Sequence, residues 1–296
     1  MARWFVSGAL GMLGRDLCDL LEERGHEVTR TDRDELDIRD AGACVEAVAG
    51  HDVVANVAAW TAVDDAETHE AEAFAINAVG AANLARAAEA AGAGLVQVST
   101  DYVFAGDATS PYAADAPLAP RSAYGRTKAA GEWAVRAECS RVWLVRTAWL
   151  YGASGASFPV TMARLAGERE RLSVVDDQVG QPTWTHDLAD AVVRVVEAGA
   201  PHGVFHATGG GQCSWFELAR AVFEELGLDP QRVEPTSSDA YVRPAPRPAY
   251  SVLSHDMWGG AGPAPLPHWR EALRRAAPSV LAPARAGPPQ PPPGRV

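Results

Sequence analysis

Tyr124 and Lys128 have the residue types and the spacing of a proton-transfer site. Four positions apart on a helix, the two side chains lie on one face. The apolar run 94–98 comes before them and leads to Thr100, whose hydroxyl can face the pair. A phenol with a pKa of ~10 is protonated at neutral pH, and a neighbouring ammonium favours the phenolate. We therefore expect Lys128 to lower the pKa of Tyr124, so that the three residues can protonate a substrate oxygen.

A glycine-rich turn lies at the start of the chain. The apolar run 3–7 is followed by Gly8, Gly11 and Gly14, and then by a leucine-rich helical pattern. Glycines permit a tight turn and let backbone N–H groups approach a pyrophosphate at a helix N-terminus. The turn therefore predicts a dinucleotide site, and its GxxGxxG spacing resembles that of extended short-chain dehydrogenases and reductases.

Strand-like and helical patterns alternate along the chain, which indicates a parallel sheet with crossover helices. Strands are expected at 3–7, 28–30, 53–57, 95–99 and 142–146. Helices are expected at 41–49, 70–91, 157–170, 187–198 and 214–227, with a further one around Tyr124 and Lys128. The fold class is therefore α/β, a Rossmann-type doubly wound parallel sheet.

We expect the chain to divide into three parts. Residues 1–153 form mainly the NAD(P)-binding Rossmann domain. Residues 154–281 form mainly a smaller substrate-binding lobe, with some segments returning to the sheet and a Pro- and Arg-rich loop at 230–250. Residues 282–296 hold six prolines and are expected to be a disordered tail.

Composition excludes several classes of protein. A net charge of -12 argues against nucleic-acid binding, which relies on clustered Lys and Arg. No apolar run approaches the ~20 residues that span a bilayer, so we expect no membrane partner. The four cysteines, Cys18, Cys44, Cys139 and Cys213, lack metal-ligand spacing and are expected to be buried thiols in the cytoplasm.

Several segments, in order along the chain, resemble the dTDP-4-dehydrorhamnose reductase family. They are residues 56–64, 99–104, 124–128, 146–152, 177–183 and 247–251. The resemblance extends to about residue 277. It implies NAD(P)H-dependent reduction of the 4-keto group of a dTDP-linked 6-deoxyhexose, first of all dTDP-4-dehydro-L-rhamnose to dTDP-L-rhamnose.

The resemblance also implies roles for single residues. Tyr124 would be the general acid, Lys128 would hold the nicotinamide ribose, and Thr100 would bond the substrate carbonyl. The substrate-binding residues implied are Thr100, Asp101, Tyr102, Val103, Trp149, Gln178, Gln181, Pro182, Thr183 and Arg247. Arg243 competes with Arg247 for the diphosphate.

The expected cofactor is NADPH, with NADH accepted. Asp32 lies where an acid would bind the ribose hydroxyls of NAD, whereas Arg30 and Arg33 could hold the 2′-phosphate of NADP. Trp60 stands where many family members have Tyr. The cofactor-binding residues expected are Gly8, Gly11, Met12, Leu13, Gly14, Arg30, Asp32, Arg33, Asp37, Ile38, Ala58, Ala59, Trp60, Ser99, Tyr124 and Lys128.

Further expectations concern metal binding, the oligomeric state and two alternative functions. Some family members form a Mg²⁺-bridged dimer through Glu side chains, but this chain has Arg15 and Asp16 at one such place, so we expect no required metal and a monomer or homodimer. A reductase for another dTDP-4-keto sugar of antibiotic biosynthesis, such as the streptose precursor, would have the same catalytic residues. A non-catalytic NADP-binding regulatory subunit would have no need of the intact set Thr100, Tyr124 and Lys128.

Overall fold

The computed structural model describes residues 1–256, 258 and 264–282 of the chain. Within these residues, six parallel strands form the central sheet, in the order β2-β1-β3-β4-β5-β10. Their bounds are β1 (Arg3–Ser7), β2 (Glu27–Thr31), β3 (Val53–Asn56), β4 (Gly94–Thr100), β5 (Val142–Thr147) and β10 (Gly203–His206). The order reverses between β1 and β3, and this is the switch point at which such sheets bind ligands.

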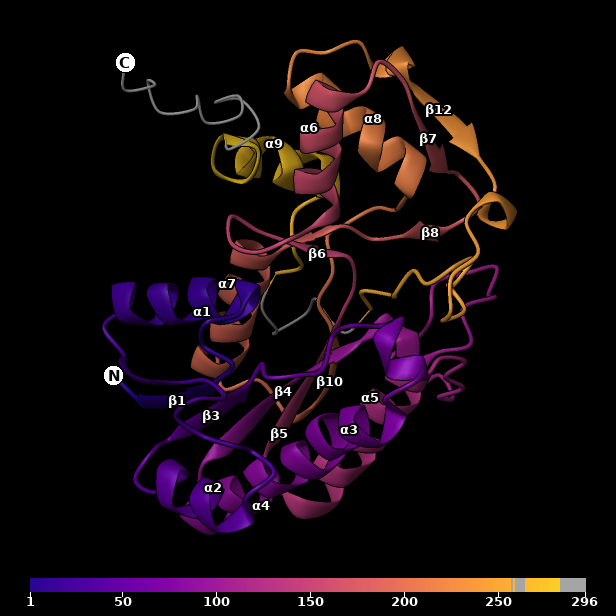
Figure 1. Cartoon of the computed structure of the whole chain (residues 1–296). Coiled ribbons are helices and arrows are strands. Elements are labelled where there is room, and N and C mark those ends of the chain that lie inside the picture. The colour runs from indigo at the N-terminus through magenta and orange to yellow at the C-terminus, as the bar shows by residue number, and fades with distance from the viewer. Residues whose placement is uncertain (257, 259–263, 283–296) are drawn as a thin grey trace, which may run out of the picture.

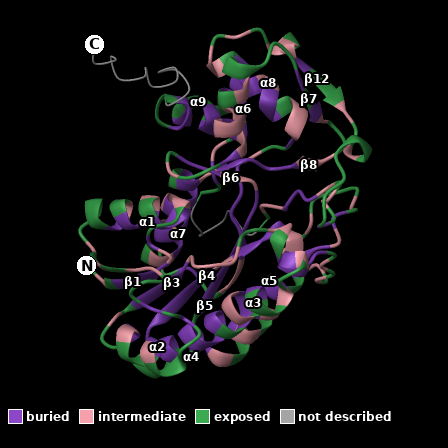
Figure 2. Cartoon of the chain, viewed as in Figure 1, coloured by how far each residue is buried: buried purple, intermediate pink, exposed green. Residues whose placement is uncertain are grey.

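Helices cover both faces of the sheet, as expected for a doubly wound fold (Figure 1). One face is covered by α1 (Met12–Glu23) and α7 (Thr185–Glu197), and their leucines pack against the buried side of β1. The other face is covered by α2 (Ala41–Val48), α4 (Ala81–Ala91) and α5 (Ala123–Glu138). The strands between them are buried on both faces (Figure 2), which explains their continuous apolar runs.

A second lobe with its own apolar core lies beyond the carboxyl ends of the strands (Figure 1). Its elements are α6 (Phe158–Glu168), β7 (Leu172–Val175), α8 (Trp215–Glu225), β12 (Val233–Thr236) and α9 (Trp269–Val280). β7 pairs with β12 in parallel. Two short strand pairs connect this lobe to the sheet: β6 (Leu150–Tyr151) with β9 (Thr183–Trp184), and β8 (Val179–Gly180) with β11 (Cys213–Ser214).

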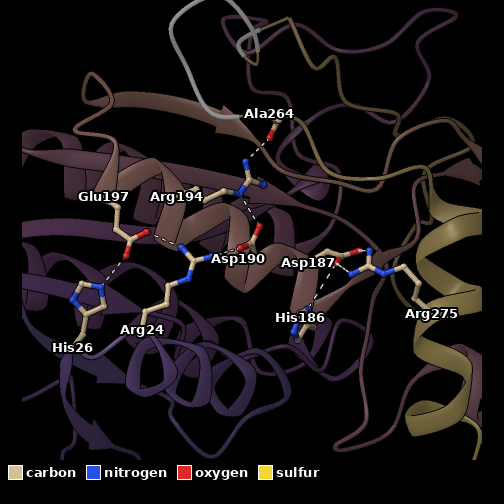
Figure 3. A network of polar contacts seen from close by, with 9 residues as sticks. All are labelled: Arg24, His26, His186, Asp187, Asp190, Arg194, Glu197, Ala264 and Arg275. Carbon is tan, nitrogen blue, oxygen red and sulfur yellow. Dashed lines mark hydrogen bonds and ion pairs between the residues drawn. The ribbon is translucent and has the colours of Figure 1, made fainter. Parts of the chain in front are cut away.

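Ion pairs join α1, α7 and α9 (Figure 3). Arg24, which ends α1, bonds both Asp190 and Glu197 of α7. At the other end of α7, Asp187 pairs with Arg275 of α9 at 3.2 Å. One helix of the sheet domain therefore contacts both the first crossover helix and the second lobe.

The structure corrects several expected elements. The helix expected at 70–91 is three segments, α3 (Glu70–Phe74), a π-helical stretch (Ala75–Gly80) and α4. In the π-helical stretch, Asn77 bonds the Trp60 backbone at 2.8 Å and Thr127 of α5 at 3.0 Å, so tertiary contacts accompany the change of helical pitch. The expected loop 230–250 contains β12, and β7, β10 and α9 were not predicted.

Three sequence-level expectations concern the rest of the chain. All four cysteines are buried and free, as predicted. Among residues 1–256, 258 and 264–282, no helix combines the length and apolarity needed to cross a membrane. The expected tail lies, from residue 283 onward, outside the described residues.

Candidate active site

A cavity of about 1530 Å³ lies at the carboxyl ends of the central strands and continues beneath the second lobe. The sheet end contributes the turn after β1, the end of β4 and the start of α5, and the second lobe contributes residues from α6, β7 and α8. The wall includes fifteen of the sixteen residues expected to bind the cofactor, all except Arg30. The cavity therefore joins the expected dinucleotide site to the expected substrate side.

The glycine turn fits a pyrophosphate sterically. Gly8 has a φ of +77°, and a Cβ there would lie 2.7 Å from the backbone nitrogen of Ala58. A Cβ on Gly14 would lie 2.2 Å from the Gly8 carbonyl oxygen. Gly11 is the N-cap residue of α1 and makes no side-chain capping bond. The backbone N–H groups of Met12 and Leu13, at the cavity wall, therefore have no capping side chain as a hydrogen-bond partner. This backbone is suited to an anionic ligand.

The expected role of Arg30 is wrong. Its guanidinium pairs with Asp19 at 2.8 Å and with Glu22 at 2.9 Å, both on α1. Successive residues of a strand point to opposite faces, and at this position of β2 the side chain points to α1. Arg33, the other candidate, lines the cavity with a side chain that is 91% exposed. Asp32 also lines the cavity and accepts the Leu10 N–H at 3.0 Å.

Arg39 is a cavity residue that the sequence analysis missed. It donates to both carboxylate oxygens of Asp37, at 2.7 to 3.1 Å, and these bonds lower the pKa of Asp37 to about 2. The Asp-x-Arg spacing was visible in the sequence, but it did not show that the pair would reach the dinucleotide end. Together with Arg33, Arg39 provides a second cation at that end.

The three expected catalytic residues meet at one wall of the cavity. Thr100 ends β4, and Tyr124 and Lys128 lie one turn apart in α5, whose N-cap is Ser122. The ammonium of Lys128 donates to the Val98 carbonyl oxygen at 2.7 Å. The four-residue spacing therefore correctly predicted that Tyr124 and Lys128 lie one turn apart on a helix. The end of β4 places the Thr100 hydroxyl at the same cavity wall.

The electrostatics of the trio differ from the expectation. Burial raises the pKa of Tyr124 well above its usual value, and a hydrogen bond with Thr100 offsets this only in part. Burial lowers the pKa of Lys128 to about 8. The expected lowering of the Tyr124 pKa by Lys128 is therefore wrong for the protein alone, because loss of hydration dominates.

Four of the expected substrate residues lie away from the cavity. Those that line it are Thr100, Asp101, Tyr102, Trp149, Gln178 and Arg247. Val103, Gln181, Pro182 and Thr183 are buried in the protein interior. Gln181 accepts from the Thr208 hydroxyl and from the Leu253 N–H, each at 2.8 Å. These four residues lie in the protein interior and not at the cavity wall, so their expected direct contact with substrate is wrong.

Trp149 is held in an unusual conformation. Its φ of +48° is in the left-handed region, and its indole stacks on Trp215 with ring centroids 3.5 Å apart. A Cβ on Gly180 would lie 2.5 Å from the indole, so a side chain there would collide with it. Trp215 and Phe158 both line the cavity, and the sequence carried no signal for either because they come from distant segments.

Arg247 and Arg243 lie on the substrate side and share one acid. Asp64 pairs with Arg247 at 2.8 Å and with Arg243 at 3.9 Å. Both arginines line the cavity, and one carboxylate neutralises only one of the two charges. This region therefore keeps a positive charge suited to a diphosphate.

A doubly wound parallel sheet with a glycine turn and a Tyr–Lys pair over one cavity defines a Rossmann-type reductase fold. The family model described as the RmlD substrate binding domain matches residues 2–281. The chain therefore belongs to this family, the family of dTDP-4-dehydrorhamnose reductases.

Three relatives illustrate the similarity. A dTDP-4-dehydrorhamnose reductase of Streptomyces griseus is 51% identical over 98% of this chain and 97% of its own. A probable dTDP-4,6-dihydroxy-2-methyloxan-3-one 4-ketoreductase of Streptomyces antibioticus is also 51% identical, over 95% of this chain and 96% of its own. The crystal structure of the Bacillus anthracis dTDP-4-dehydrorhamnose reductase in complex with NADP is 37% identical and has a TM-score of 0.89, covering 93% of this chain and 98% of that one.

Proposed function

We propose that the protein reduces the 4-keto group of a dTDP-linked 6-deoxy sugar with NADPH, converting dTDP-4-dehydro-L-rhamnose to dTDP-L-rhamnose. The observation that carries the proposal is the meeting of Thr100, Tyr124 and Lys128 in the cavity that begins at the glycine turn. Relatives named for such reductions match the chain over almost its full length. The NADP complex of the Bacillus anthracis relative supports the cofactor.

The residues present fit a dinucleotide. The Gly8 turn would take its pyrophosphate, and Arg33 and Arg39 would hold a 2′-phosphate, which favours NADPH over NADH. Lys128 would bond the nicotinamide ribose from its place beneath Val98. When bound, NADPH would supply the hydride for the reduction.

Tyr124 acts as the proton donor in this proposal. Its raised pKa keeps the phenol protonated at neutral pH, so the proton is available when charge develops on the substrate oxygen. Thr100 fixes the phenol by a hydrogen bond. Because the phenol is in place before the reaction, its O–H group stabilises the oxyanion without reorganisation.

The substrate would lie between Tyr124 and the second lobe. Trp149, stacked on Trp215, offers an apolar wall to a deoxyhexose. Arg247 and Arg243 would pair with the diphosphate, and Gln178 borders the same space. The sugar nucleotide is accordingly the expected small-molecule partner.

The test follows NADPH absorbance with enzymatically generated dTDP-4-keto-6-deoxyglucose, with and without a 3,5-epimerase. We expect oxidation that requires the epimerase and is lost in Tyr124→Phe. Tyr112→Phe is a matched control, because its hydroxyl accepts backbone N–H groups of residues 106–108 away from this wall. Absence of oxidation under both conditions, with NADPH still bound, would refute the rhamnose assignment.

A second candidate is a 4-ketoreductase for another dTDP-sugar. Its support is the equal identity, 51%, to the Streptomyces griseus reductase and to the Streptomyces antibioticus ketoreductase, which are named for different substrates. Oxidation of NADPH that does not need the epimerase, or that appears only with another 4-keto sugar, would favour this candidate.

A further inference from the structure

Asp101 is a buried carboxyl group next to Thr100 at the cavity wall. It follows Thr100 at the end of β4 and is only 2% exposed. The resemblance placed it among residues that bind substrate, yet its carboxyl also bonds the neighbouring hydroxyl. Thr100 Oγ1 donates to Asp101 Oδ1 at 2.9 Å.

The Thr100 hydroxyl connects this carboxyl to the phenol. Besides bonding Asp101, it accepts the Tyr102 N–H at 3.2 Å and shares a hydrogen bond with Tyr124. A hydroxyl has a single proton to donate. While Asp101 is ionised, that proton is held by the carboxylate. When Asp101 is protonated, the carboxyl donates to Thr100, and the Thr100 proton becomes free to point at Tyr124.

The surroundings of Asp101 destabilise its ionised form relative to an exposed carboxylate. Its Oδ2 is buried without a partner of normal hydrogen-bond geometry in residues 1–256, 258 and 264–282. An ionised oxygen without donors is costly in such a place, whereas a neutral carbonyl oxygen costs less. Burial raises the pKa of Asp101 to about 6, against the opposing hydrogen bonds of the Ser251 and Thr100 side chains and of the backbone at residues 101 and 102.

The charged groups near this carboxyl are few. The titratable groups that face it are the phenols of Tyr102 and Tyr124. Asp64 and Arg247 influence the pKa of Tyr102, the residue after Asp101, and they pair with each other. The causes that shift the pKa of Asp101 are burial and hydrogen bonds, and no charged side chain is among them.

We propose that Asp101 is the proton source that recharges Tyr124 through the Thr100 hydroxyl after each turnover. The inference rests on the proposed function, in which NADPH supplies the hydride. The Tyr124 O–H bond breaks as the proton joins the substrate oxygen and leaves a phenolate. The phenolate takes the Thr100 proton, and Thr100 takes the Asp101 carboxyl proton. The carboxylate regains a proton from solvent, so each turnover consumes one proton.

The decisive comparison is between the first turnover and later ones. Asp101→Asn keeps the shape and the bond to Thr100 but has no acidic proton to deliver. With enzyme in excess and NADPH already bound, we expect its single-turnover rate within about threefold of wild type, because Tyr124 still holds its proton. In steady state we expect kcat to fall by at least about tenfold.

The pH profile supplies a readout that a structural role would not move. Protonated Asp101 is the active form, so wild-type kcat should fall as the pH rises through an apparent pKa of about 6 or above, since bound substrate removes further water. Asp101→Asn should lack this step. The matched control is Asp107→Asn, an exposed acid paired with Arg121, which should keep the wild-type profile.

Two results would overturn the relay. Equal losses in single-turnover and steady-state rates would mean that Asp101 only shapes the site, and an unchanged steady-state rate would mean that Tyr124 is recharged from another source. Failure of the proposed function would be distinct, because wild type itself would then reduce no dTDP-4-keto sugar. In that case, infrared difference spectra of wild type against Asp101→Asn still report the protonation of this carboxyl, and a group ionised at pH ~5 would refute the proposal.

Discussion

Replacing Glu132 by Gln should cost the protein several kcal/mol of stability, because it leaves a buried arginine without its counter-charge. Glu132 of α5 and Arg146 of β5 form an ion pair whose side chains are 2% and 3% exposed. The carboxylate accepts three hydrogen bonds: two from Arg146 at 2.9 and 2.7 Å, and one from Ser99 at 2.6 Å. A hydrogen bond to a charged group contributes about 1.5–3 kcal/mol.

Glutamine can keep its oxygen at the Oε1 position, which accepts two of the three bonds, so the bond from Arg146 Nη2 is lost and the negative charge is removed. One such bond amounts to about 1.5–3 kcal/mol, and the buried Arg146 also loses its counter-charge, so the total falls near the roughly 3–5 kcal/mol found when one partner of a buried pair is removed. We therefore expect the free energy of unfolding to fall by about 3–5 kcal/mol. Denaturant unfolding followed by tryptophan fluorescence measures this change.

An exposed pair between α3 and α5 provides the control. Glu70 and Arg126 make bonds of similar length, but both side chains are 44% exposed. Glu70→Gln should cost less than about 1 kcal/mol, because water replaces the lost contacts. The double variant Glu132→Leu with Arg146→Met should be more stable than Glu132→Gln, since it leaves no uncompensated charge. Equal losses for Glu132→Gln and Glu70→Gln would refute the reasoning.

Three further predictions concern the cavity. Gly180→Ala should displace the Trp149 indole, raise KM for the sugar nucleotide by about tenfold or more and leave NADPH affinity unchanged, as steady-state kinetics and a direct cofactor titration would show. Arg33→Ala should weaken NADPH binding by about tenfold while NADH binding changes little, and a parallel loss for both would contradict a phosphate contact. Because the pKa of Lys128 is about 8 in the folded protein and ~10.4 when unfolded, the unfolded chain binds more protons between these values. The ligand-free protein should therefore gain stability as pH rises from about 8 to about 10, and a Tm that shows the same rise in Lys128→Met would contradict this assignment.

The local sequence determined the elements that carry the chemistry. The glycine spacing after the run 3–7 indicated a strand, a tight turn and a helix, because backbone conformation there depends on the absence of a Cβ. The spacing of Tyr124 and Lys128 placed both on one helix face. The alternation of apolar strand-like runs with helical stretches indicated a parallel sheet. Each of these features follows from periodicity or from steric limits within a few residues.

Only the tertiary structure decided which side chains reach the cavity. The sequence could not show that Arg30 points to α1 and Arg33 to the cavity, since this depends on which face of β2 is covered. It also could not show that Gln181 supports the cavity wall from behind, or that Trp215 stacks on Trp149 from a segment some 66 residues further on. These placements result from packing between distant segments.

The pKa values of the trio likewise depended on the fold. The charge of Lys128 suggested a lowered pKa for Tyr124, but burial removes the water that would stabilise a phenolate and so raises it. The same burial raises the pKa of Asp101 beside Thr100. The sequence identified side chains that could exchange a proton. How deeply the sheet and α5 bury these side chains determines the pKa of each.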